Sequence, residues 1–88
     1  MKLTFDPAKD RLNIAKHGVS LAVATGLEWD TALTWTDTRY AYGEPRECAI
    51  AYIGLRLFYV AFVDRVDGRR IISLRKATTT ERNRYAAS

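Results

Sequence analysis

The sequence predicts an α+β fold in which two N-terminal helices and a C-terminal helix pack on an antiparallel β-sheet of about four strands. Helix-capping signals gather at the two ends of the chain, whereas the middle is rich in Ile, Val, Tyr and Phe, residues that favour strands. With 88 residues, of which 48% are hydrophobic, the chain can bury one modest core. We therefore expect residues 1–88 to form a single domain.

The N-terminal part should begin with a short strand over residues 2–5 and continue into a helix that ends at about His17. Asp6 is a favourable N-cap, and Pro7 suits the first helical position because its missing N–H costs nothing there. Gly18 can end this helix in the left-handed conformation. A second N-cap at Ser20 predicts a second, shorter helix before the sheet.

The central part should form most of the sheet. The expected strands cover residues 32–36, 47–53, 57–63 and 70–74, and a polar loop covers residues 37–45. Asp67 and Gly68 form a strong hairpin signal between the last two strands, so the last three should make an antiparallel meander. Thr78 and Glu81 have the spacing of a capping box and predict a final helix that reaches about Ala86.

Positive charge is concentrated in the C-terminal part of the chain. The net charge is +4, but residues 1–64 hold seven basic and eight acidic side chains, a balance of −1. Residues 65–88 hold seven basic and two acidic side chains, a balance of +5, and six of the seven are arginines. Because arginine can grip a phosphate in a bidentate fork, this pattern favours a polyanionic partner over a merely solubilised surface.

Several function classes find no support in the sequence. One cysteine, Cys48, cannot form an internal disulfide, and with a single histidine there is no spacing typical of metal ligands. We find no phosphate-binding glycine loop, nucleophile elbow or carboxylate cluster, so we expect neither cofactor nor metal. No signal-peptide core or membrane-length apolar stretch is present, so we expect a cytoplasmic protein with no membrane contact.

His17 is the only histidine and hence the only candidate imidazole base, although it could equally cap the C-terminus of its helix through the helix dipole. On the strand near residue 72, regular alternation places Ser73 and Arg75 on one face and Arg70 on the other. Arginines at a sheet edge could snorkel, or they could face a phosphate. On the final helix Tyr85 could pack or stack on an RNA base.

The ordered motifs together resemble the BrnT family of type II toxins over nearly the whole chain. The N-terminal motifs are Asp6-Pro7, Lys9, Asn13 and Lys16-His17-Gly18-Val19-Ser20. The C-terminal motifs are Gly43-Glu44, Arg46, Ile53-Gly54, the run from Arg70 to Thr78, Glu81-Arg82 and Tyr85. This resemblance implies a RelE-like ribonuclease toxin that inhibits translation by cleaving RNA. It also implies a cognate BrnA-like DNA-binding antitoxin, through which alone the toxin would contact DNA.

Residue roles are hypotheses built on the positions that match the family. The catalytic candidates are Lys16 and His17 for proton transfer, Arg70 and Arg75 for the phosphate, and Tyr85 for stacking or proton transfer. The RNA-binding candidates are Arg46, Lys76 and Arg82. If alternation is regular, Arg70 and Arg75 can meet one phosphate only near a sheet edge or a bulge, so we favour Arg75 as catalytic and Arg70 as structural. The chemistry should need no metal. The alternatives are a non-catalytic module that binds RNA or ribosomes, and a structural interaction protein.

Overall fold

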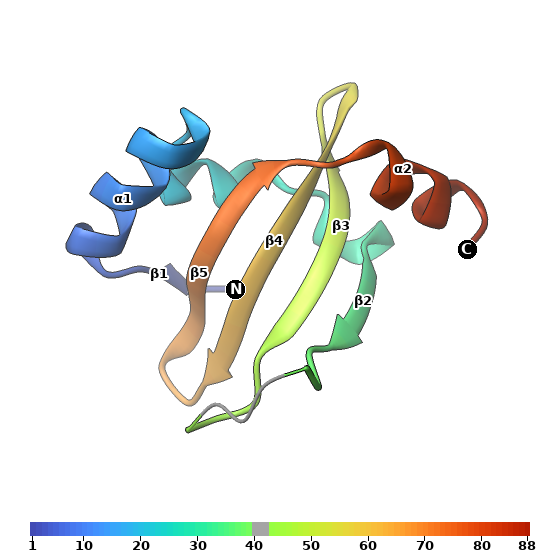
Figure 1. Cartoon of the computed structure of the whole chain (residues 1–88). Helices are drawn as coiled ribbons and strands as arrows, with labels where there is room; N and C mark the ends of the chain where they lie inside the picture. The colour runs from blue at the N-terminus through green and yellow to red at the C-terminus, as the bar shows by residue number, and fades with distance from the viewer. Residues whose placement is uncertain (40–42) are drawn as a thin grey trace.

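The computed structural model describes residues 1–39 and 43–88 and confirms the α+β class (Figure 1). The elements in chain order are β1 (Leu3–Thr4), α1 (Pro7–His17), the 3-10 helices η1 (Leu21–Gly26) and η2 (Trp29–Thr31), β2 (Leu33–Thr36), β3 (Glu47–Ile53), β4 (Arg56–Arg65), β5 (Gly68–Lys76) and α2 (Thr79–Ala86). The predicted loop over residues 37–45 includes positions 40–42, which lie outside the described residues. No helix in the described part of the chain is long and apolar enough to cross a membrane.

The sheet differs from the predicted antiparallel one, because it is mixed and has five strands in the order β1-β5-β4-β3-β2. The meander of β3, β4 and β5 is antiparallel as predicted, and β2 extends it antiparallel to β3. The short strand β1 pairs parallel with the start of β5, with Leu3 opposite Arg69. At this junction Gly68 has φ of +141°, and a Cβ there would lie 2.7 Å from the Lys2 carbonyl oxygen. Only glycine therefore fits both the turn and the approach of β1.

The second, shorter N-terminal helix predicted from Ser20 is present as the six-residue 3-10 helix η1. Its N-cap is Ser20, as predicted, whose hydroxyl accepts from the Ala22 N–H at 3.1 Å. Leu21, Ala24 and Leu27 are buried. Their spacing of three residues matches the three residues per turn of a 3-10 helix, which places all of them on one side.

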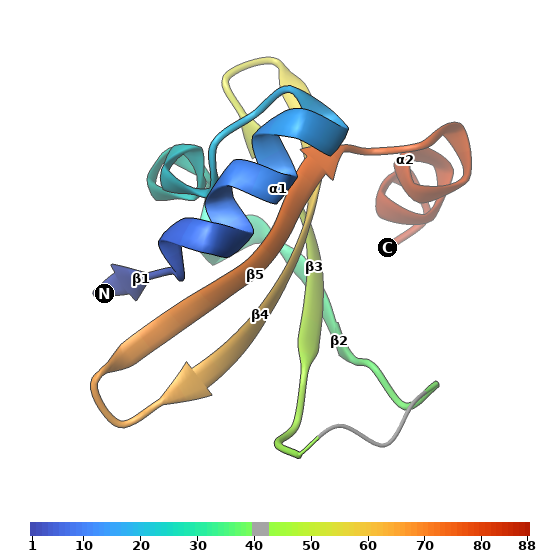
Figure 2. The same ribbon diagram turned by 60° about the vertical axis from the view of Figure 1, so that its left-hand side comes forward.

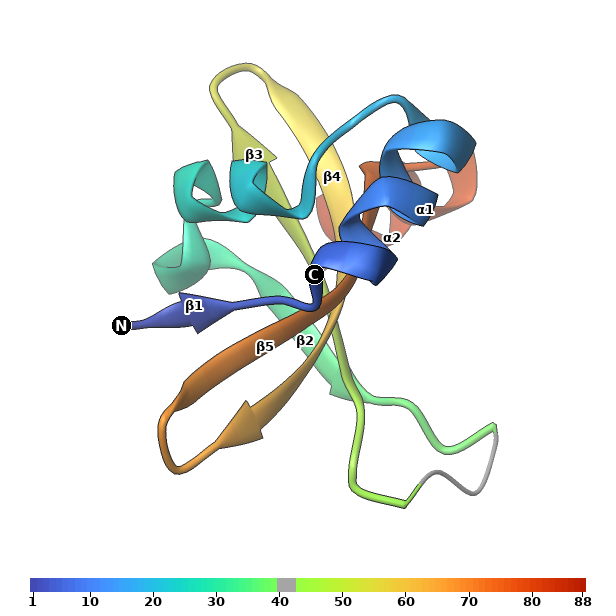
Figure 3. The ribbon, with the colours of Figure 1, turned by 90° about the vertical axis from the view of Figure 1, so that its left-hand side faces the viewer.

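The sheet has apolar contacts on both faces, with η1 on one side of it and α2 on the other, and α1 lies along the β5 edge (Figures 2 and 3). The main core lies on the η1 side, where Val60, Phe62 and Leu74 pack against Leu21. A smaller core lies on the α2 side. Its buried members are Ile50, Leu57 and Ala77, and the partly buried Leu33, Trp35, Tyr52 and Tyr85 pack against them.

Helix α1 is fixed to the free edge of β5 by one buried side chain. Asn13, 6% exposed, accepts from the Leu74 N–H at 3.2 Å and donates to the Leu74 carbonyl at 2.8 Å. Its amide also donates to the Val19 carbonyl at 2.8 Å. The Asn13 amide thus satisfies edge groups that a further strand would otherwise pair with.

Candidate functional site

A bulge in β5 brings the candidate arginines to one face of the sheet. Ser73 pairs with Ala61 and Ile71 with Phe62, so Ile72 is the extra residue on β5. Beyond this bulge the alternation is reset, and regular alternation across it was therefore a wrong expectation.

The β4 partners of Arg70 and Arg75 show that the bulge brings both arginines to one face. Arg75 lies opposite Tyr59 and Arg70 opposite Val63, and these partners are four residues apart on one strand. Residues spaced by an even number share a face, so Arg70, Ser73 and Arg75 all lie on the α2 side of the sheet. We call the α2 side of β5, together with Tyr59 and Cys48, the arginine face. Arg70 and Arg75 are roughly 13 Å apart along the strand, at about 3.3 Å per residue.

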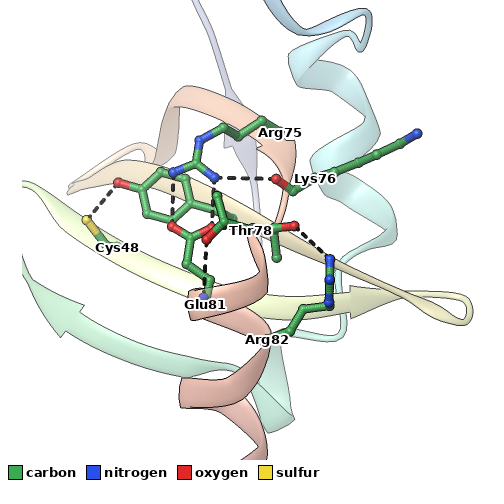
Figure 4. Close-up of polar contacts among 8 residues, drawn as sticks. Cys48, Arg75, Lys76, Thr78, Glu81 and Arg82 are labelled. Carbon is green, nitrogen blue, oxygen red and sulfur yellow. Dashed lines mark hydrogen bonds and ion pairs between the residues drawn. The ribbon is translucent and has the colours of Figure 1, made fainter.

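Arg75 is held by three contacts from three directions (Figure 4). Its two terminal nitrogens donate to the two carboxylate oxygens of Glu81 at 2.8 and 2.9 Å. Nη1 also donates to the Lys76 carbonyl at 3.3 Å. The guanidinium carbon lies 4.2 Å from the centroid of the Tyr59 ring. These contacts fix both the position and the plane of the guanidinium group.

The contacts of Arg75 leave one edge of its guanidinium open. Of its five N–H donors, both on Nη1 and one on Nη2 are used by Glu81 and the Lys76 carbonyl. The N–H on Nε and the second N–H on Nη2 donate to no group in the described part of the chain. Those two donors form the side-on fork that suits two oxygens of a phosphate.

Glu81 is the charge partner of Arg75, a role that sequence analysis did not give it. The predicted capping box is present, since Glu81 accepts from the Thr78 N–H at 2.9 Å while its own N–H donates to the Thr78 hydroxyl. The hydrogen bonds from Arg75 lower the pKa of Glu81 below its ordinary value, and the same pairing raises the pKa of Arg75. The carboxylate therefore stays ionised and keeps the guanidinium oriented.

Tyr59 and Cys48 form the neutral floor beside Arg75. The Tyr59 hydroxyl and the Cys48 sulfur lie 3.2 Å apart, within hydrogen-bond distance. Burial, followed by this hydrogen bond, raises the pKa of Tyr59 strongly, and burial also raises the pKa of Cys48. Neither group ionises near neutral pH, so neither places a negative charge beside Arg75.

A cavity of about 280 Å³ opens at this position. Its lining residues are Trp35, Arg39, Cys48, Tyr59, Arg75, Glu81 and Arg84. The Arg84 guanidinium lies 4.0 Å from the centroid of the Trp35 ring. Of these residues sequence analysis identified only Arg75 as a site residue. The aromatic and acidic members come from β2, β4 and α2, and no local motif links them.

His17 and Lys16 lie at the C-terminus of α1 and line a small pocket with Ile72 and Ser73 at the edge of β5. Burial lowers the pKa of His17 below 6.5, and the positive charges of Lys16 and Arg75 lower it further. His17 is therefore mostly neutral at neutral pH. Its pocket includes Ser73, so it lies beside the arginine face. A neutral imidazole can accept a proton, as the base hypothesis requires.

The other candidates lie at separate places. Arg70 approaches Asp6 at 3.9 Å, and both it and Arg46 contribute to the lowered pKa of Glu44, whose largest cause is the hydrogen bond from Arg65. They lie near the start of β3 and β5, whereas Lys76 and Arg82 lie at the end of β5 and on α2. Of the three predicted RNA-binding residues, Lys76 and Arg82 therefore line one cavity, and Arg46 lies apart from them.

Tyr85 is engaged within the fold. Its hydroxyl donates to the Thr31 carbonyl at 3.1 Å, and its ring meets Tyr52 edge to face at a centroid distance of 5.4 Å. These contacts favour the packing alternative for Tyr85. Within residues 1–39 and 43–88, no three His, Cys, Asp or Glu side chains are grouped so that they could hold a metal ion.

The geometry defines a small α+β protein with a preorganised arginine in a cavity on one face of its sheet. Comparison with protein families then identifies the class: residues 5–81 match the family described as the ribonuclease toxin BrnT of type II toxin-antitoxin systems. The chain belongs to this family, as the sequence motifs indicated. It is accordingly a ribonuclease toxin that pairs with a cognate antitoxin. No match is found among curated proteins.

Proposed function

We propose that this toxin cleaves RNA on the arginine face without a metal ion, with Arg75 as the group that binds the reacting phosphate. The observation that carries the proposal is the fixed guanidinium of Arg75 with its side-on fork open. A donor held in place before the reaction stabilises developing negative charge without the cost of reorienting during the reaction. In a metal-free mechanism this charge on the phosphate must be balanced by the protein.

His17 is the proposed base, and Lys16 beside it is the alternative proton-transfer group. In the proposed reaction the base removes the proton of the ribose 2′-hydroxyl, and the 2′-oxygen attacks the adjacent phosphorus. The bond from phosphorus to the 5′-oxygen breaks, a 2′,3′-cyclic phosphate remains, and the leaving 5′-oxygen takes up a proton. The lowered pKa of His17 supports this role because the imidazole is available as a proton acceptor at neutral pH.

The remaining candidates have supporting roles in this proposal. Arg70 lies on the same face as Arg75 but roughly 13 Å along the strand at about 3.3 Å per residue, so it suits a neighbouring phosphate better than the same one. Arg46 lies toward that end of the face. Tyr85 holds α2 against Thr31 and Tyr52, and this contact helps to keep Glu81, on the same helix, in position.

The test is incubation of the purified protein with labelled RNA in excess EDTA. We expect cleavage products that end in a cyclic phosphate. A mobility shift without products in both EDTA and Mg²⁺ would favour the non-catalytic RNA-binding module, and cleavage that needs added metal would contradict the metal-free mechanism.

We further propose that the antitoxin is a BrnA-like DNA-binding protein and that it covers the arginine face.

A further inference from the structure

We infer that a second cavity, on the other side of the N-terminal turn of α2, binds the RNA backbone next to the phosphate held by Arg75. This inference rests on the function proposed above and adds a subsite to it. The cavity has a volume of about 450 Å³ and lies between the β3–β4 hairpin and α2. We call it the hairpin pocket. Its three cations are Arg56, Lys76 and Arg82, and its apolar wall includes Tyr52, Leu57 and Ala77.

The chain itself places this pocket beside the arginine face. Arg75 and Lys76 are consecutive on β5, and their side chains leave the strand on opposite sides (Figure 4). Glu81 and Arg82 are consecutive on α2, with Glu81 lining the Arg75 cavity and Arg82 lining the hairpin pocket. One strand end and one helical turn therefore separate the two cavities, so a single RNA strand can engage both.

The hairpin pocket is positively charged, because its lining holds three cations and no acidic residue. Arg82 is fixed there by hydrogen bonds to the Ala77 carbonyl at 3.3 Å and the Thr79 hydroxyl at 3.0 Å. The side chains of Arg56 and Lys76 are exposed and make no ion pair or hydrogen bond with any residue that the structure describes. Their charges are therefore available to a ligand.

The combination of cations and an aromatic wall selects the kind of ligand. Phosphates suit the cations, and a base or sugar can lie against Tyr52 and Leu57, as in other single-strand binding grooves. An acidic peptide would use the cations too, but the immediate continuity with the Arg75 cavity favours the substrate that occupies that cavity. Because the lining holds cations and largely apolar side chains without an Asn, Gln, Asp or Glu to read a base edge, we expect binding that depends on charge more than on sequence.

The test compares two double variants that remove the same charge. Arg56→Ala/Lys76→Ala changes the hairpin pocket and leaves Arg82, which supports α2, in place. Lys2→Ala/Arg11→Ala is the matched control, since both residues are exposed and line none of the three cavities described here. The probe is a fluorescent single-stranded oligoribonucleotide with 2′-O-methyl groups, which cannot be cleaved. Its affinity is measured at several salt concentrations, and melting temperatures confirm that each variant is folded.

We expect the pocket variant to lose about 1.4 from the slope of log affinity against log salt, at about 0.7 per phosphate contact. When salt rises from about 50 to 200 mM, the fold-decrease in affinity of the wild type should therefore be roughly seven times that of the pocket variant. Equal slopes for both double variants would overturn the inference even if the wild type cleaves RNA. A pocket variant that binds RNA normally but no longer binds the antitoxin would also overturn it. Failure of the wild type to bind or cleave any RNA would instead overturn the proposed function.

Discussion

Arg75 is held in one orientation by groups that belong to the fold, so its proposed role depends on these neighbours as well as on its charge. Glu81 takes the end of the guanidinium, the Lys76 carbonyl takes a further N–H, and Tyr59 lies under its plane. A lysine ammonium carries the same charge on a flexible chain, without a planar fork. The geometry, rather than the charge, is therefore the feature that a substitution can test.

Replacing Arg75 with Lys should lower the rate of RNA cleavage on the order of a hundredfold or more, the usual loss for one transition-state donor. The melting temperature should change little because the charge opposite Glu81 remains. The matched control is Arg69→Lys, which alters another β5 arginine that is paired with Asp64 at 2.6 Å and packs against Phe62. That control should cleave at the wild-type rate. An Arg75→Lys variant that keeps this rate would remove Arg75 from the mechanism.

The pH dependence should report His17. Its pKa is lowered below 6.5, so kcat/KM should rise with pH through a midpoint below that value and then level off. Glu81 has a pKa below 4.5 and is already ionised over this range. We would measure kcat/KM over roughly pH 5 to 8. The His17→Gln variant should lack the acidic limb, and an unchanged limb in that variant would assign it to another group.

At the residue scale, sequence reasoning named Arg75 and His17 as candidates but did not find the groups that surround Arg75. Glu81 was recognised through its local capping box, a pattern of residues three apart. Its second role, as partner of Arg75, depends on how α2 turns back toward β5. Tyr59 meets Arg75 only through the pairing of β4 with β5. Contacts of this kind come from the assembled sheet and leave no local sequence signal.

At the scale of elements, α1, α2 and the three meander strands were predictable because caps, glycines and apolar runs mark them, although β4 and β5 extend beyond the expected residues 57–63 and 70–74. The β5 bulge was not. Regular alternation around Ile72 would mix apolar residues and cations on each side of the strand, and the extra residue that separates them becomes visible only against the register of β4. The 3-10 form of η1 had a signal in the spacing of three between Leu21, Ala24 and Leu27, which also fits one face of a short α-helix.

The attachment of α1 to the edge of β5 depends on Asn13, which gives an element-scale prediction. Asn13→Ala should reduce the free energy of unfolding by about 2 to 4 kcal/mol, because it leaves edge groups of Leu74 and the Val19 carbonyl without their partner. Denaturant unfolding measures this loss. Asn83→Ala, at an exposed position of α2, is the control and should change stability by less than about 0.5 kcal/mol. Equal stability of the two variants would contradict the role of Asn13.

At the scale of the whole molecule, ion pairing redistributes the positive charge that the sequence concentrates after residue 64. Four of the seven basic side chains in residues 65–88 form ion pairs, namely Arg65, Arg69, Arg70 and Arg75. The other three, Lys76, Arg82 and Arg84, form no ion pair within the described residues. Lys76 and Arg82 line the hairpin pocket, and Arg84 lines the cavity of Arg75, so all three lie in the cavities that flank α2. The excess charge is therefore presented around α2, beside the Arg75 fork, which the charge balance alone could not have located.

This placement makes the free toxin and its complex with the antitoxin differ in one testable way. Induced expression of the chain alone in a bacterial host should stop growth and lower the rate of translation, because the arginine face is then open to cellular RNA. Coexpression of the cognate antitoxin should restore growth, since we expect it to cover that face and neutralise the charge around α2.

The control for this growth experiment is the Arg75→Lys variant expressed to the same soluble level, which should leave growth nearly normal. Continued growth with folded, soluble wild-type protein would contradict RNA cleavage as the toxic activity. Equal arrest by the Lys variant would show that toxicity does not depend on the Arg75 fork, and would move the active site away from the arginine face.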